Sequence, residues 1–222
     1  MSNKVLWNSV SKTDPRAVKP ITGKTYKGNS PKPYWLIERA TEEFGPIGIG
    51  WGVDVKSERF ERLGEFDVLH VAVVSVWYVR DGVRSQTFDQ MGGTKAAYMS
   101  SKGSLIVDED AGKKSVTDGM VKCLSMIGFA GDIFSGRWDD SKYVEETAAE
   151  FIAKDRAEAR AYWLADWLSA IDAAATVGDL KRVMDTCLEQ ARAEQDGDAE
   201  GQFLAAQATK MAKAKKAKEQ TA

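Results

Sequence analysis

Lysines and aromatic residues are interleaved near the start of this 222-residue chain. The basic residues of this stretch are Lys19, Lys24, Lys27 and Lys32, and the aromatic ones are Tyr26, Tyr34 and Trp35. Ammonium groups bind phosphates as point charges, and unpaired bases stack on aromatic faces. The pattern therefore favours binding of a flexible polyanion, such as a single nucleic-acid strand. Tyr34 and Trp35 could equally serve to pack the helix that follows.

Catalytic motifs are weak in this chain. The stretch "TGKT" at 22–25 matches the end of a phosphate-binding loop, but that loop needs a glycine where the chain has Val18. The single histidine, His70, lies in an apolar run, which indicates a hydrogen-bonded structural residue rather than a general base. The acidic run at 108–110 could hold a metal ion, but acids before a helix more often interact with its positive N-terminus. We therefore expect no enzymatic activity, no cofactor and no metal site.

The net charge of −2 hides an uneven distribution. Residues 1–36 carry seven basic residues and one acid, and residues 205–222 carry five lysines and one acid. Residues 139–204, in contrast, carry seven basic and 16 acidic residues. Positive ends on an acidic body favour a polyanionic partner, although basic arms can also serve solubility alone.

Apolar periodicity predicts an α+β fold, in which a long helix packs on a three-stranded antiparallel sheet. A further helix precedes the sheet, and a helical region follows the long helix. The expected elements are an ordered loop or an arm at 1–32, a helix at 33–44, strands at 47–60, 66–79 and 83–91, a loop at 92–112 and the long helix at 113–134. Pro33 suits the first turn of its helix, Gly45 its end, and an Asp-Gly turn joins the last two strands.

The long helix has a glycine in the middle of its apolar face. The residues of that face are Val116, Gly119, Met120, Cys123, Leu124 and Ile127, at the spacing of one helix side. Glycine costs about 1 kcal/mol relative to alanine in a helix. Gly119 therefore predicts that another element approaches the helix backbone closely, and Lys113, Lys114 and Lys122 fall on the solvent side.

The pattern of the C-terminal third predicts helices. Residues 144–171 form a strong helical pattern, and Thr176 with Asp179 is close to a capping box for a second helix. We expect a domain at 1–145, a helical region at 146–195 and a basic flexible tail at 196–222. Two apolar-stripe cysteines without a CxxC motif, and no run suited to a membrane span or signal peptide, favour the cytoplasm.

Two stretches, "LIERATEEFGPIGIGWGVDV" at 36–55 and "SVTDGMVKCLSMIGFAGD" at 115–132, resemble the single-strand annealing proteins of homologous recombination. More narrowly, they resemble the superfamily of the eukaryotic mediator Rad fifty-two, in a phage-type branch. In that family a helix ending in Phe-Gly leads into a three-stranded antiparallel sheet. A long helix containing Val-Thr-Asp-Gly then packs across the sheet. The resemblance covers roughly residues 30–138.

The resemblance implies a ring-shaped or helical homo-oligomer that takes part in DNA recombination and repair. A basic groove would hold single-stranded DNA by its phosphates, with the bases outward, so that a complementary strand pairs without ATP. A host single-strand-binding protein or a partner exonuclease would be a further partner. An alternative function is the loading of recombination factors through the acidic helical region, and a metal-dependent nuclease is a third hypothesis.

The family's basic contacts match only in part. Its two basic positions after Thr-Asp-Gly, and a third further on, correspond here to Val121, Lys122 and Ser125, so only Lys122 agrees. Other lysines would supply the missing charge, while Thr117 and Asp118 are expected to be structural. The expected DNA-binding residues are Lys19, Lys24, Tyr26, Lys27, Lys32, Lys95, Lys102, Lys113, Lys114 and Lys122.

Overall fold

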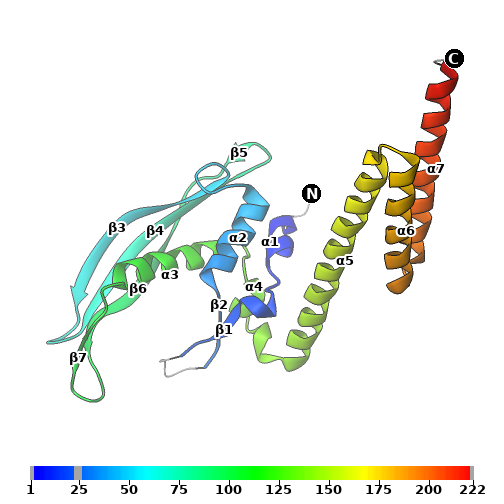
Figure 1. Cartoon of the computed structure of the whole chain (residues 1–222). Helices are drawn as coiled ribbons and strands as arrows, with labels where there is room; N and C mark the ends of the chain where they lie inside the picture. The colour runs from blue at the N-terminus through cyan, green and yellow to red at the C-terminus, as the bar shows by residue number, and fades with distance from the viewer. Residues whose placement is uncertain (1–2, 23–26, 221–222) are drawn as a thin grey trace. The chain divides into compact units, whose positions relative to one another are not determined.

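The computed structural model of the chain divides into two compact units (Figure 1). Unit 1 spans Met1–Ala149 and unit 2 spans Glu150–Ala222, so the boundary falls just after the expected residue 145. The structure describes residues 3–22 and 27–220, with side chains up to residue 216. None of the helices it describes is both long enough and apolar enough to cross a membrane.

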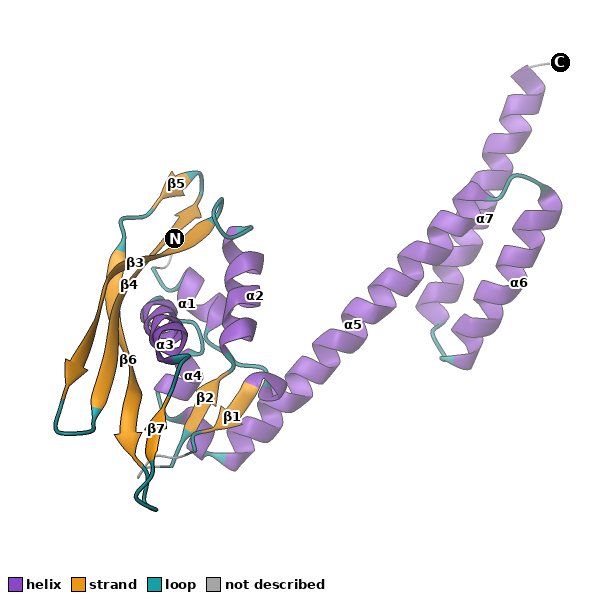
Figure 2. Ribbon diagram, turned by 60° about the vertical axis from the view of Figure 1, so that its left-hand side comes forward, coloured by secondary structure: helices purple, strands orange, loops and turns teal. Residues whose placement is uncertain are grey.

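Unit 1 is α+β, as expected, with a curled antiparallel sheet and several helices. Its elements are α1 (Val5–Val10), η1 (Pro15–Ala17), β1 (Val18–Pro20), β2 (Asn29–Pro31), α2 (Pro33–Phe44), β3 (Trp51–Arg62), β4 (Val68–Arg80), β5 (Val83–Arg84), β6 (Phe88–Met99), β7 (Leu105–Val107), α3 (Ala111–Met126), α4 (Gly131–Phe134), η2 (Arg137–Asp139) and the start of α5 (Ser141–Ala173). The helices α1, α2 and α3 all lie on one side of the main sheet (Figure 2).

The main sheet has the strand order β3-β4-β6-β7, and β5 pairs with the end of β4. All pairings are antiparallel, and His70 of β4 lies between Phe60 of β3 and Thr94 of β6. A separate two-stranded ribbon is formed by β1 and β2. Because side chains alternate between the faces of a strand, the register decides which residues face α3.

The core of unit 1 lies between α3, α2 and the sheet. The apolar face of α3 is buried as expected, with Met120, Cys123 and Leu124 in the same cluster as Val74 of β4. From α2 the residues Leu36, Ala40 and Phe44 join this cluster, and Gly45 ends that helix with a φ of 95°. The helix predicted at 33–44 is therefore confirmed.

Two expectations for unit 1 are wrong. The helix expected at 113–134 ends at Met126, and a separate short helix, α4, begins at Gly131. Residues 92–112 are not a loop, because β6 continues to Met99 and turns back into β7 before α3 begins. The glycines at 92 and 93 are strand residues, and α3 packs closely against the first of them. Residues 1–32 were expected as an ordered loop or an arm, and their described part contains α1, η1 and the β1–β2 ribbon.

Unit 2 is helical and has its own core. It contains the rest of α5, then α6 (Val177–Ala193) and α7 (Gly197–Gln220). The expected capping box is present, because Thr176 and Asp179 each bond to the backbone N–H of the other. In the stretch expected as a basic flexible tail, α7 occupies the described residues from Gly197 on, and its Phe203 is fully buried in the core of unit 2.

Candidate nucleic-acid interface

A groove of about 480 Å³ runs between the β1–β2 ribbon and α3, and we call it the arm–α3 groove. Its lining residues are Lys19, Ser30, Pro31, Pro33, Asp110, Lys113, Lys114, Thr117, Asp118 and Val121. Three of the expected DNA-binding lysines, one from the ribbon and two from α3, thus meet in one place. Each of them is exposed to solvent.

Local structure explains why these lysines point into the groove. On α3 the residues 113, 114, 117, 118 and 121 repeat at helical spacing, so they share the side of the helix that borders the ribbon. On the ribbon, Lys19 pairs with Ser30, and the N–H of Lys32 donates to the carbonyl of Ala17 at 2.7 Å. The ribbon is therefore joined directly to the start of α2.

Acidic residues neutralise part of the groove's charge. Lys113 lies 2.9 Å from Asp110, and Lys114 lies 2.7 Å from Asp108. The hydrogen bond from Lys114 lowers the pKa of Asp108, and the same bond raises the pKa of Lys114. Lys19 forms no ion pair with any residue that the structure describes, so it is the least compensated cation of the groove.

Thr117 and Asp118 make the structural contacts expected of them. The hydroxyl of Thr117 donates to the carbonyl of Lys113 at 2.9 Å. Asp118 accepts a 3.2 Å hydrogen bond from the backbone N–H of Gly93, on the strand β6. Sequence reasoning assigned neither residue to the interface, although the spacing of four from Lys113 and Lys114 places both on the groove side of α3.

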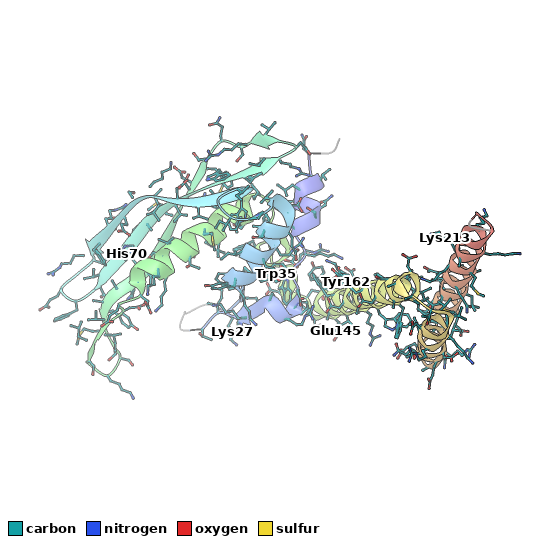
Figure 3. All side chains as sticks on the ribbon, turned by 45° about the horizontal axis from the view of Figure 1, so that its top comes forward. Lys27, Trp35, His70, Glu145, Tyr162 and Lys213 are labelled. Carbon is teal, nitrogen blue, oxygen red and sulfur yellow. The ribbon has the colours of Figure 1, made fainter. Side chains whose placement is uncertain are left out.

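A second depression of about 490 Å³ lies beside the start of α2, and we call it the α2 hollow. Its lining residues are Asp14, Arg16, Ala17, Lys32, Tyr34, Trp35, Ile37 and Glu38. Lys32 belongs to this hollow rather than to the groove, and its ammonium group donates to the carbonyl of Arg16 at 2.8 Å. Figure 3 labels Trp35 in the first turn of α2 and Lys27 on the arm.

The other expected site residues that the structure describes do not line the groove. Lys95 follows Thr94 on β6, so it points to the sheet face opposite α3, where it pairs with Asp67 at 3.1 Å. Lys102 lies in the turn between β6 and β7, and Lys27 precedes β2. Lys122 lies one helical turn beyond Asp118, with its ammonium group 5.2 Å from the ring centre of Phe134. Lys24 and Tyr26 fall outside the described residues.

The residues weighed above for catalysis or metal binding are His70 and the acids at 108–110. His70 is almost fully buried, its Nδ1 has no partner among the described residues, and its Nε2 lies 3.6 Å from a Glu58 oxygen, which is too far for a hydrogen bond. The hydrogen bond expected for this histidine is therefore absent there. The acids at 108 and 110 are engaged by Lys114 and Lys113. Within the described residues, no three His, Cys, Asp or Glu side chains are grouped to hold a metal ion.

Both cysteines are buried free thiols. Burial raises the pKa of Cys123 to about 11, and it also raises the pKa of Cys187. Thiols held in their protonated form are poor nucleophiles and poor metal ligands.

A scan of protein-family models finds no match to this chain, and a search of curated proteins finds no similar sequence.

Proposed function

We propose that the chain binds single-stranded DNA and anneals complementary strands without ATP. The observation that carries this proposal is the arm–α3 groove, where Lys19, Lys113 and Lys114 meet. Point charges along a groove suit the phosphates of a flexible strand, and binding of this kind requires no base-specific contact. The groove would hold the strand by its phosphates and leave most of its bases free to pair.

The order of elements supports the same proposal. A helix ending in Phe-Gly, three long antiparallel strands and a helix with Val-Thr-Asp-Gly follow one another as α2, β3, β4, β6 and α3. We propose that these elements form the β-β-β-α core of an annealing protein. The short strands β5 and β7 would be additions to that core.

We further propose that copies of the chain assemble into a ring or filament. The strand β3 pairs with β4 on one side and with no described strand on the other. Natural proteins cover or pair such long edges, and a second copy could do so while extending the groove. Sedimentation with and without oligonucleotide tests this, and a monomer in both conditions would refute it.

An annealing assay tests the main function. Two complementary oligonucleotides, one with a fluorophore and one with a quencher, are mixed without ATP or metal. We expect the wild-type protein to accelerate quenching and to prefer single strands over duplex. The double variant Lys19→Glu/Lys113→Glu should lose both effects. Lys154→Glu, a charge reversal at an exposed lysine of unit 2, is the control. Quenching no faster than without protein would refute the proposal.

A second candidate function is partner binding by unit 2. This unit has its own core and a hollow of about 700 Å³, whose walls include Arg156, Trp163, Gln190 and Glu194. A host single-strand-binding protein or an exonuclease would be the partner. Truncation after Ala149 keeps Tyr143 and Thr147, which are buried in unit 1. We expect this truncation to retain annealing and to lose the partner in a binding assay.

A further inference from the structure

The α2 hollow differs chemically from the neighbouring groove. Its two acids balance its two basic residues: Arg16 lies 2.6 Å from Asp14, while Lys32 and Glu38 line the same hollow without a salt bridge between them. What remains is an aromatic surface. Tyr34 is 85% exposed, whereas Trp35 is partly buried against the core of unit 1. A neutral hollow with an aromatic wall suits a planar, uncharged group better than a phosphate.

The hollow and the groove are neighbours along the backbone. Pro31 and Pro33 line the groove, while Lys32 and Tyr34 line the hollow. Successive residues of one segment thus face the two depressions in turn. A strand whose phosphates lie beside Lys19 would carry its next bases past this segment.

We propose that the α2 hollow is a base-binding subsite, in which one unpaired base of the bound strand stacks on Tyr34. This inference rests on the proposed single-strand binding and names a contact that the groove lysines do not make. Trp35 forms the fixed wall of the subsite because it is packed against the core. The Lys32 ammonium group uses one N–H on the carbonyl of Arg16, and its other two N–H groups remain for the phosphate next to the stacked base.

Exposure of Tyr34 supports a ligand-binding role over a packing role. A ring that is 85% exposed contributes little to the core, and Tyr34 forms no hydrogen bond with a described residue. Aromatic rings next to cationic side chains are typical of sites that bind single strands by stacking. A hydrophobic peptide is the competing occupant, but it carries no phosphate to match the ammonium group of Lys32.

The test compares Tyr34→Ala with Tyr34→Phe, which keeps the ring. A matched control is Tyr162→Ala, at a tyrosine of unit 2 that is 75% exposed (Figure 3). Each full-length protein is titrated with an oligothymidine and with an abasic strand of the same length. We expect Tyr34→Ala to weaken binding of the oligothymidine by about 5-fold to 150-fold, the range that loss of one stacking contact produces.

Binding of the abasic strand should be the same for all four proteins, since it offers phosphates but no base. Equal affinity of wild type and Tyr34→Ala for oligothymidine would overturn the subsite and leave the proposed function standing. If Tyr34→Ala weakens binding of the oligothymidine and of the abasic strand alike, the subsite is overturned too, because Tyr34 would then act through the phosphates or through folding. Failure of the wild-type protein to bind either strand would overturn both the subsite and the proposed function.

Discussion

Gly92 of β6 and Gly119 of α3 meet at the closest approach between the sheet and the helix. A Cβ atom added to Gly92 would collide with the carbonyl oxygen of Ser115 and lie 2.5 Å from the backbone nitrogen of Gly119. A Cβ atom added to Gly119 would lie 2.6 Å from Cγ2 of Val74. Neither backbone can carry a side chain here, which confirms that another element approaches Gly119 closely.

Gly92→Ala should therefore destabilise unit 1. The obstacle is helix backbone, so α3 must move away from the sheet, and overpacking of this kind costs about 1–3 kcal/mol or more. Gly93→Ala is the matched control, because the nearest atoms to its added Cβ lie 3.8 and 3.9 Å away. Urea unfolding measures the difference, and equal midpoints for the two variants would contradict the close contact.

Local signals predicted the elements that have strong periodicity or caps. Gly45 and Pro33 mark the ends of α2, and the Thr176 capping box marks the start of α6. The extension of β6 was missed because Gly92 and Gly93 are usually read as chain breakers. The reason for Gly92 is a close tertiary contact with α3, which no local pattern contains. Beyond Phe203, α7 carries few large apolar residues, although its alanines and lysines are strong helix formers.

Only the α3 side of the candidate site could be predicted from the sequence. The solvent side of α3 follows from its apolar stripe, so Lys113 and Lys114 could be placed from the sequence. That Lys19 joins them depends on how the ribbon docks on α3, a long-range contact. Lys95 was expected in a loop. It lies on the strand β6 instead, where its side chain points to the sheet face opposite α3.

Asp132 should be the most sensitive polar residue of unit 1. Its buried carboxylate accepts bonds from the backbone and hydroxyl of Thr13, from the indole of Trp138 and from the hydroxyl of Tyr143. Asp132→Asn puts an amide NH₂ among these donors, so at least one donor loses its acceptor. The free energy of unfolding should fall by about 1–3 kcal/mol as a result. Asp139→Asn, at an exposed site nearby, should change the free energy of unfolding by no more than about 0.5 kcal/mol relative to wild type. Urea unfolding of both variants is the measurement, and similar stabilities would contradict this role.

Unit 2 should lose stability in acid through Asp196. The side-chain hydrogen bond from Arg160 lowers the pKa of Asp196 from 3.8 to about 2. A carboxyl whose pKa is lowered by folding stabilises the fold above 3.8, and this contribution disappears as the pH falls to about 2. Arg160→Gln should make unfolding less pH-dependent across this window and weaken unit 2 at neutral pH. Arg156→Gln is the control, and the same pH slope in both variants would rule out the pair.

Removing an acid from the arm–α3 groove should strengthen DNA binding. Asp110 pairs with Lys113, so Asp110→Asn frees that ammonium group for a phosphate. We expect tighter binding and a salt slope steeper by about 0.7, the value for one contact on a single strand. Glu109→Gln removes the same charge from the adjacent position, where no lysine is paired in the described structure. An equal gain from both variants would indicate a general field effect instead of a freed contact.

Lys122 tests how far the interface extends along α3. Its charge lies beyond the groove, over the ring of Phe134. If a strand continues past Asp118, Lys122→Ala should weaken binding to all sequences alike and reduce the salt slope by about 0.7. Lys122→Arg, which keeps the charge, should bind as the wild type does. Stability should change by no more than about 1 kcal/mol, the upper value of an exposed cation–ring contact. Titrations with single-stranded DNA at three salt concentrations measure this slope. An unchanged slope in Lys122→Ala would show that the interface does not extend beyond the groove to Lys122.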